Sequence, residues 1–269
     1  MNDAPIGIFD SGMGGLTVMR ALVQKLPDER FVYLGDTARL PYGTKSAETV
    51  RRYALQAAQS LTARGVKLIV IACNTASVSL AALQEALAPL PVMGVIAPGA
   101  RAALSIAPEG PIAVIATEGT VKGGAYLRAI HALSAAPVVQ QACPLFVPLA
   151  EEGLTQGPIV EAVAHRYLDP LLARMPRPKA LVLGCTHFPV LREVIARVAG
   201  DDVALIDSAT AAADATAALL AEHGLARRGA ATEPNRFLAT DAPDRFARIG
   251  EIFLGAPIDP GTVALVDLQ

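Results

Sequence analysis

The chain has 269 residues, a formal net charge of −2, and a composition that is 52% hydrophobic with aromatic residues at only 4%. This charge leaves no basic surface for nucleic acid or for a membrane, and every apolar stretch is broken well before the ~20 residues that a bilayer-spanning helix needs. The three cysteines form no CxxC pair, which argues against a disulfide framework, and the first residues lack the basic and apolar regions of a secretory signal. We therefore expect a cytoplasmic protein that binds a small molecule.

Apolar runs alternate with helical patterns along the first hundred residues. The runs at 6–11, 30–36, 68–71 and 91–96 predict strands. Helices are predicted to begin near Leu16 and to cover 46–64 and 76–87, while the segment 37–43 is predicted as a loop by its Pro and Gly. The segment Ala-Pro-Gly-Ala at 97–100 is the expected crossing point into a second half of the chain.

The second half repeats the alternation. Strands are predicted at 112–116, near Val138 and before Cys185, with helices over 123–133 and 159–175. From about Asp207 the chain continues with a long alanine-rich helix, the loop 227–235 and a strand at 236–240. This tail follows the last repeated element, so we expect it to pack back on the first half.

Two predicted strands end in the same sequence pattern, with a small residue and then a cysteine directly after the aliphatic run. Leu-Ile-Val-Ile-Ala-Cys-Asn-Thr-Ala-Ser surrounds Cys73, and Leu-Val-Leu-Gly-Cys-Thr-His surrounds Cys185, 112 positions later, while the strand at Ile6 has a partner 106 positions later at Ile112. Neither run alternates apolar with polar residues, which is typical of parallel sheets buried on both faces. We expect two similar parallel-sheet α/β lobes related by a pseudo-two-fold axis, one of residues 1–97 with 208–269 and one of 98–207.

Ligands of open α/β sheets bind at the carboxyl ends of the strands, so the two lobes would direct two thiols into one cleft. The amides and dipole of a following helix favour the thiolate, which is the reactive form of cysteine. The third cysteine, Cys143, precedes a proline and has no polar neighbour, which indicates a small buried hydrophobe.

Several other sites compete for these residues. The loop Gly-Met-Gly-Gly at 12–15 suggests dinucleotide binding, but Thr17 stands where that fingerprint needs its third glycine, and no Walker motif occurs. Asp10 and Asp36 follow strands, where helix caps are common. Cys185 with His187 alone suggests a thiol hydrolase, and both cysteines with Asp10 and His187 suggest zinc, although the spacing lacks closely placed ligand pairs.

Six motifs, in this order, closely resemble those of glutamate racemases in the aspartate/glutamate racemase superfamily. The resemblance extends to about Asp207 and surrounds both cysteines. The motifs are Asp-Ser-Gly-Met-Gly-Gly at 10–15, Gly-Asp-Thr-Ala-Arg-Leu-Pro-Tyr-Gly at 35–43, Ala-Cys-Asn-Thr-Ala-Ser at 72–77, Thr-Glu-Gly-Thr-Val at 117–121, Ala-Glu-Glu-Gly at 150–153 and Gly-Cys-Thr-His-Phe-Pro at 184–189.

This resemblance implies a racemase without cofactor or metal that supplies D-glutamate for peptidoglycan and often forms dimers. It implies Cys73 and Cys185 as the acid/base pair, with Asp10 assisting the first and His187 the second. Asp36 and Glu152 are implied as further catalytic residues. The residues that it implies for substrate binding are Asp10, Ser11, Pro41, Tyr42, Gly43, Asn74, Thr75, Thr117, Thr120, Thr186 and His187.

Two positions depart from the family pattern. Gly123 stands where the family often has serine, and Ala97 stands where glutamate is frequent, so the shape or polarity of the cleft is expected to differ. Two alternative functions stay open at this point. One is a racemase of the same superfamily for aspartate or another amino acid, and the other is a two-lobed protein that binds an acidic ligand without chemistry.

Overall fold

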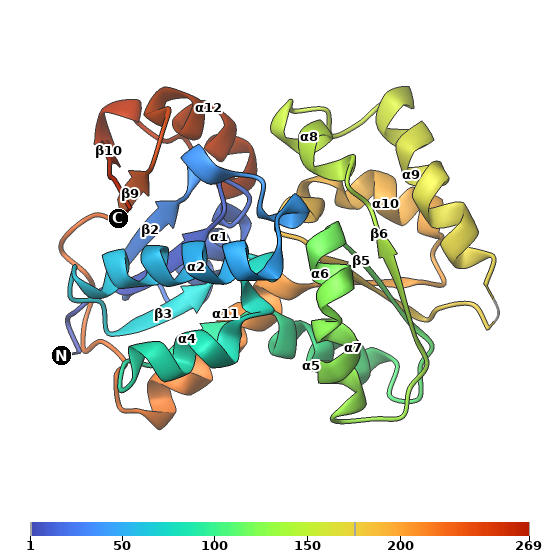
Figure 1. The fold of residues 1–269 in the computed structure, drawn as a ribbon, viewed down its shortest axis with the longest axis horizontal. Coiled ribbons are helices and arrows are strands. Elements are labelled where there is room, and N and C mark those ends of the chain that lie inside the picture. The colour runs from blue at the N-terminus through green and yellow to red at the C-terminus, as the bar shows by residue number, and fades with distance from the viewer. Residues whose placement is uncertain (1, 175, 269) are drawn as a thin grey trace.

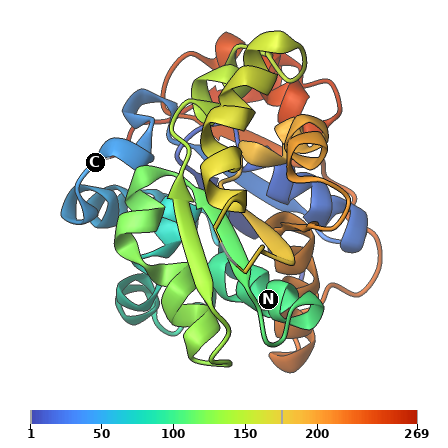
Figure 2. The ribbon, with the colours of Figure 1, turned by 90° about the vertical axis from the view of Figure 1, so that its right-hand side faces the viewer.

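The computed structural model describes residues 2–174 and 176–268 and contains two separate parallel β-sheets. Figure 1 shows them side by side, and Figure 2 shows the smaller sheet from the side that faces away from the larger one. We call the six-stranded sheet with its helices the first lobe and the four-stranded sheet with its helices the second lobe. The predicted fold class, α/β with two parallel sheets, is confirmed.

The six strands of the first lobe follow the spatial order β10-β9-β2-β1-β3-β4, and all pairs are parallel. β1, β2 and β3 are buried along their whole length, as runs of aliphatic residues without polar alternation predict. The strands are β1 (Ile6–Asp10), β2 (Phe31–Gly35), β3 (Leu68–Ile71), β4 (Val92–Gly94), β9 (Arg236–Ala239) and β10 (Val263–Leu265).

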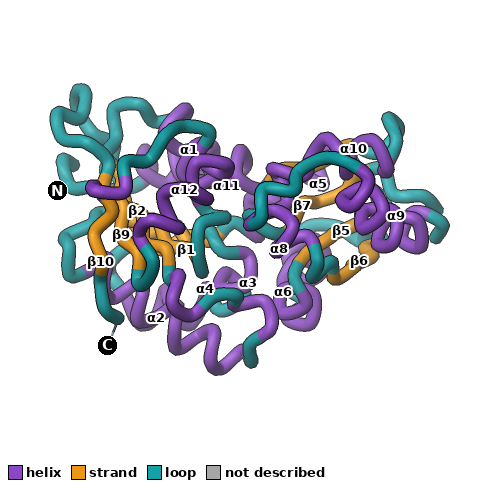
Figure 3. The backbone as a smooth tube through the Cα atoms, turned by 90° about the horizontal axis from the view of Figure 1, so that it is seen from above, coloured by secondary structure: helices purple, strands orange, loops and turns teal. Residues whose placement is uncertain are grey.

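The second lobe has the order β6-β5-β7-β8, which repeats the β2-β1-β3-β4 portion of the first sheet. β3 and β7, the strands that precede Cys73 and Cys185, therefore occupy equivalent positions in the two sheets. Figure 3 shows the two sets of strands on opposite sides of the molecule, with helices between them. The strands are β5 (Ile112–Ala116), β6 (Val138–Ala142), β7 (Ala180–Gly184) and β8 (Ala204–Asp207).

Twelve helices in the described parts of the chain pack on these sheets, and none of them is long and apolar enough to cross a membrane. α11 contacts both α1 and α5, so it joins the two lobes. The helices are α1 (Leu16–Lys25), α2 (Ala47–Thr62), α3 (Asn74–Ser77), α4 (Leu80–Leu87), α5 (Ile96–Ile106), α6 (Glu118–Gly123), α7 (Ala125–His131), α8 (Phe146–Glu151), α9 (Pro158–Leu172), α10 (Arg192–Ala199), α11 (Ser208–Glu222) and α12 (Pro243–Leu254).

The structure differs from the predicted elements at several points. The segment 97–100, the expected crossing point, lies in α5, which connects β4 of the first sheet to β5 of the second. Pro98 is in the first turn of this helix, where a missing N–H costs nothing. The helix predicted over 123–133 is divided by Gly124, which has a φ of +59° between α6 and α7. The sequence patterns did not predict α5, α6, α8, α10, α12, β8 or β10. The division of the chain at 97 and 207 stays a proposal. The strands of the six-stranded sheet all lie within 1–97 and 208–269, and those of the four-stranded sheet all lie within 98–207.

The tail packs back on the first lobe, as its position after the repeat predicts. β9 pairs with β2 and thereby extends the first sheet, and α11 packs on α1. In Figure 1 the red end of the chain, with β10 and α12, covers the upper end of the first lobe.

A buried ion pair fixes this tail to the sheet. Lys67 Nζ lies 2.6 Å from Glu29 Oε2, and the two side chains are only 1% and 4% exposed. Lys67 also donates to the carbonyls of Asn2 and Leu225, at 2.7 and 2.8 Å, and Glu29 accepts from the N–H of Arg227 at 2.8 Å. The segment after α11 is therefore bound to the residues that begin β2 and β3.

Replacing Lys67 should destabilise the fold strongly. Lys67→Met should lower the free energy of unfolding by ~3 kcal/mol, because Glu29 would keep a buried and unpaired charge. Lys25→Met is the matched control, since the pair of Lys25 with Asp214 is 50% and 59% exposed and should contribute less than ~1 kcal/mol. Urea unfolding followed by circular dichroism measures both, and equal losses would contradict the importance of the buried pair.

Candidate active site

Both strand-end cysteines line the same cavity between the lobes. Cys73 follows β3 as the N-cap of α3, Cys185 follows β7, and the two side chains are 4% and 5% exposed. The cavity has a volume of only about 20 Å³, which is room for about one water molecule. Its lining residues are Ser11, Gly12, Leu40, Pro41, Tyr42, Gly43, Cys73, Asn74, Thr75, Thr117, Val147, Glu151, Cys185, Thr186 and His187.

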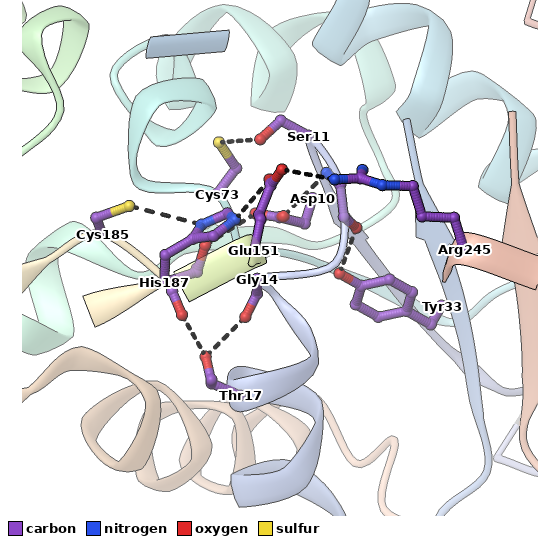
Figure 4. Close-up of polar contacts among 12 residues, drawn as sticks. Asp10, Ser11, Gly14, Thr17, Tyr33, Cys73, Glu151, Cys185, His187 and Arg245 are labelled. Atoms are coloured by element: carbon purple, nitrogen blue, oxygen red, sulfur yellow. Dashed lines mark hydrogen bonds and ion pairs between the residues drawn. The ribbon is translucent and has the colours of Figure 1, made fainter. Parts of the chain in front are cut away.

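The thiol of Cys73 is surrounded by groups of the first lobe. It donates to Ser11 Oγ at 3.7 Å and accepts from the N–H of Ala76 at 3.4 Å (Figure 4). Burial and the nearby Asp10 raise the pKa of Cys73 to about 12, although the bonds to Ala76 and Ser11 act in the opposite direction. Desolvation therefore outweighs the helix start that led us to expect a favoured thiolate.

The thiol of Cys185 lies at the end of a chain of polar groups from the second lobe and the tail. His187 Nδ1 is 3.8 Å from the sulfur, and His187 Nε2 is 3.1 Å from Glu151 Oε1. Arg245 on α12 lies 3.5 Å from the other carboxylate oxygen of Glu151. The ring of Phe253, also on α12, packs edge-on against the ring of His187, with the two ring centroids 5.1 Å apart. Figure 4 shows this chain from Arg245 through Glu151 and His187 to Cys185.

These contacts keep His187 charged. Burial alone would lower the pKa of His187, but the hydrogen bonds to Cys185 and Glu151 outweigh it and raise the pKa to about 10. Burial favours the neutral form of Glu151, but His187 and Arg245 outweigh it and hold the pKa of that carboxyl below its usual range. The two thiols thus have unlike neighbours, a carboxylate near Cys73 and an imidazolium beside Cys185.

The glycine-rich loop of the first lobe makes room for the second lobe. A Cβ added to Gly14 would lie 2.4 Å from His187 Nδ1 and 2.6 Å from Thr186 Oγ1. The hydroxyl of Thr17 donates to the carbonyl of Gly14 and to that of Thr186, at 2.9 and 3.1 Å, and so joins the lobes at this point. The close approach of His187 explains Gly14 without any bound nucleotide.

Three threonine hydroxyls form a second bridge between the lobes. Thr75 Oγ1 lies 2.9 Å from Thr117 Oγ1 and 3.2 Å from Thr120 Oγ1, and the latter two are 3.0 Å apart. Gly123, which stands where the family often has serine, lies near this bridge. A Cβ added to Gly123 would be 2.7 Å from the side chain of Val78. A serine at 123 therefore does not fit beside Val78 in this chain.

The structure brings most of the predicted site residues together, but four do not reach the cavity surface. Asp10 is fully buried and accepts hydrogen bonds from Gly12 N and Thr186 Oγ1, at 3.0 and 3.4 Å. Asp36 lies behind the cavity, where it accepts from the hydroxyl of Tyr42. Thr120 holds its position in the hydroxyl bridge behind Thr117.

The fourth residue is Glu152, which the structure separates from the site. Glu152 is exposed at the end of α8, whereas its neighbour Glu151 is buried and contacts His187. Two adjacent glutamates look alike in the sequence, and only the rotation of α8, which buries Phe146 and Ala150 on the same side, decides which one points inward. The structure therefore places Glu151, and not Glu152, beside His187, and the catalytic role expected of Glu152 stays a prediction.

Three contributors were not predicted from the sequence. Arg245 and Phe253 belong to α12, in the part of the chain where no motif was recognised, and Tyr126 hydrogen bonds to Asn74 from α7. Within residues 2–174 and 176–268, no group of three or more His, Cys, Asp or Glu side chains is arranged to hold a metal ion. Cys143 is buried in the core of the second lobe, outside the cavity.

Two α/β lobes thus enclose one cavity, and each lobe contributes a buried cysteine to its lining. The family model of Asp/Glu/hydantoin racemases matches residues 6–216, so the chain belongs to this family of amino-acid racemases.

Its relatives share the whole length of the chain. A glutamate racemase from Geobacter metallireducens is 47% identical over 98% of this chain and 97% of that protein. The crystal structure of glutamate racemase from Francisella tularensis in complex with D-glutamate has a TM-score of 0.92 and 39% identity, covering 100% of this chain and 99% of that one. The crystal structure of a glutamate racemase isoform from Bacillus anthracis has a TM-score of 0.93 and 38% identity, and it also covers 100% of this chain and 99% of that one.

The space left by Gly14 should be essential for activity. Gly14→Ala should lower the turnover number ~100-fold or more, because the added methyl displaces His187 from Cys185. Gly12→Ala is the matched control and should lose far less, since its methyl would meet only the side chain of Leu40, at 3.5 Å. Steady-state racemisation assays compare the two, and equal losses would contradict the steric argument.

The pair of Glu151 and His187 should give a pH-dependent contribution to stability. The raised pKa of His187 stabilises the fold fully below its ordinary value of 6.5, and this contribution is lost as the pH rises toward about 10. The lowered pKa of Glu151 stabilises the fold above its ordinary value of 4.5. Glu151→Gln should therefore cost most, ~2 kcal/mol, between about pH 5 and pH 6.5 and progressively less toward pH 10.

Urea unfolding at a series of pH values measures this difference. Asp169→Asn is the control, because the pair of His165 with Asp169 is 57% and 61% exposed and should contribute little at any pH. A cost of Glu151→Gln that is constant across the range would contradict the assigned charges.

Proposed function

We propose that this protein is a cofactor-independent glutamate racemase that interconverts L- and D-glutamate with Cys73 and Cys185 as two opposed bases. The observation that supports this most directly is that Cys73 and Cys185 line one cavity from opposite lobes. The relatives support the choice of substrate, because proteins of this length and up to 47% identity are glutamate racemases and one of them is in complex with D-glutamate.

Racemisation requires that a proton leave one face of the α-carbon and that another arrive on the opposite face. One thiolate takes the α-proton and becomes a thiol, and the opposite thiol donates its proton to the planar carbanion and becomes a thiolate. The two groups exchange roles when the reaction runs backwards, so no net proton is consumed. A single base would have to cross the plane of the substrate between the two steps.

The surroundings of the thiols suit these roles. Burial raises the pKa of Cys73 to about 12, so its thiolate is a strong base once it forms, and strong bases are needed to remove an α-proton. The charged His187 beside Cys185 balances a negative sulfur there, and Glu151 with Arg245 holds the imidazolium in place. Asp10 is proposed to assist Cys73 from beneath, and Asp36 is proposed to position Tyr42 rather than to touch the substrate.

The substrate is proposed to lie among the backbone and hydroxyl donors of the cavity. The lining residues expected to hold its carboxylates and its amine are Ser11, Pro41, Tyr42, Gly43, Asn74, Thr75, Thr117, Thr186 and His187. A cavity of about 20 Å³ is far smaller than an amino acid, so the described structure corresponds to a closed state. Glutamate therefore enters by a movement of the lobes or of the segment 37–45, and closure afterwards excludes water from the carbanion.

The family resemblance supports the wider biological proposal. It supports the proposal of a cytoplasmic protein that forms a homodimer and supplies D-glutamate for peptidoglycan. An aspartate racemase of the same superfamily is the alternative enzyme. Circular dichroism of both enantiomers of glutamate and of aspartate distinguishes the two, because only the true substrate loses its optical activity.

Removing either thiol should abolish racemisation but leave one half-reaction. Cys73→Ala and Cys185→Ala should each lower racemisation by a factor of ~1,000 or more, because one face of the carbanion loses its proton donor. Each variant keeps the base on the other face, so each should exchange the α-hydrogen of only one enantiomer with deuterated water. The two variants should exchange opposite enantiomers, which NMR of the recovered glutamate measures.

Cys143→Ala is the matched control, since this third buried cysteine lies outside the cavity, and it should racemise glutamate as the unchanged protein does. Wild-type turnover in either cavity variant would contradict the two-base mechanism. Saturable glutamate binding without any α-hydrogen exchange in the unchanged protein would instead indicate a binding protein.

A further inference from the structure

One side chain of the cavity has a hydrogen-bonding group that the protein leaves unused. Asn74 follows Cys73, lines the cavity and is only 2% exposed. Its Oδ1 accepts a hydrogen bond from the hydroxyl of Tyr126 at 2.8 Å. Its Nδ2 is buried and has no hydrogen-bond partner among the residues that the structure describes. A buried donor without a partner costs free energy, so this amide indicates a ligand atom that completes it.

Tyr126 is held rigidly in the position from which it reaches Asn74. The ring is fully buried between two glycines of the second lobe. A Cβ added to Gly99 would lie 3.2 Å from the Tyr126 hydroxyl, and one added to Gly184 would lie 3.0 Å from the ring. Gly184 is the last residue of β7, directly before Cys185, so the ring packs against the strand end that carries the second thiol.

The hydroxyl of Tyr126 is bonded to the oxygen end of the Asn74 amide. Burial raises the pKa of Tyr126 well above its ordinary value, so the hydroxyl keeps its proton and acts as a donor. A donor bonds to the amide oxygen and not to the amide nitrogen. Without this bond the two orientations of the amide become similar in energy, and one of them presents an oxygen to an anionic substrate.

We propose that Tyr126 is a positioning residue that fixes the Asn74 amide with its NH2 group toward the cavity, where this group donates to a carboxylate of the bound amino acid. This inference rests on the proposed function, since it assigns Asn74 to an anionic substrate. The bond crosses from α7 of the second lobe to α3 of the first. The carboxylate donor is therefore oriented only when the lobes lie as they do in this structure.

Tyr126→Phe removes the hydroxyl and keeps the ring, so it tests the proposal. We expect the variant to lose about 10-fold in kcat/KM, because a hydrogen bond to a charged group is weakened. The loss should appear mainly in KM, with kcat changed less than about twofold, since the carboxylate is bound in the ground state as well as in the transition state. L- and D-glutamate have equal free energies, so kcat/KM must fall by the same factor in both directions.

A double-mutant cycle distinguishes positioning from general packing. In the background of Asn74→Ala there is no amide to orient, so adding Tyr126→Phe should change kcat/KM by less than about twofold. A purely structural role would give the same 10-fold loss in both backgrounds and would overturn the proposal. Tyr167→Phe is the matched control, because its hydroxyl only accepts from the N–H of Leu145, outside the cavity, and its kinetics should not change.

A second variant keeps the test decisive if Tyr126→Phe does not fold. Gly99→Ala adds a methyl 3.2 Å from the Tyr126 hydroxyl, which displaces the donor, and should raise KM in the same direction. An unchanged KM in the folded variants, with normal turnover in the unchanged protein, would overturn the role of Tyr126 alone. Failure of the unchanged protein to racemise glutamate would overturn the proposed function and this inference together.

Discussion

The structure depends on the close contact of two lobes at the ends of their equivalent strands. Each lobe supplies one thiol, and the two sulfurs can share a cavity only if almost nothing lies between the strand ends. Gly14 leaves the space that His187 fills, and Gly43 approaches Thr117 so closely that a Cβ would lie 2.7 Å from it. Gly14 and Gly43 of the first lobe therefore leave the space that His187 and Thr117 of the second lobe occupy.

This closeness also determines the electrostatics. A cavity with room for about one water molecule penalises every charge, so the charges that remain must stabilise one another. The hydrogen bonds to Cys185 and Glu151 raise the pKa of His187, and Glu151 in turn faces Arg245. Cys73 has only hydroxyl and amide partners at hydrogen-bond distance, and its pKa rises. The two equivalent strand ends thus hold two thiols in chemically unlike surroundings.

The last part of the chain has a role beyond packing. β9 and β10 complete one side of the first sheet, with β10 at its edge. Thr240, just after β9, donates to Asp36 at 3.0 Å, and Asp36 also accepts from Tyr42. α12 brings Arg245 and Phe253 to the group of residues around His187. The segment that shows least resemblance to the family therefore supports both sides of the cavity.

The sequence by itself determined the α/β class, the repeat, and the strand-end positions of Cys73 and Cys185, because buried parallel strands and strand-to-helix turns leave patterns within a few residues. It could not determine which of Glu151 and Glu152 points inward, since that depends on the rotation of α8. Nor could it assign Arg245 or Tyr126, which meet their partners across more than fifty positions of chain. The pKa of Cys73 was likewise decided by tertiary structure, because burial outweighs the helix start visible in the sequence.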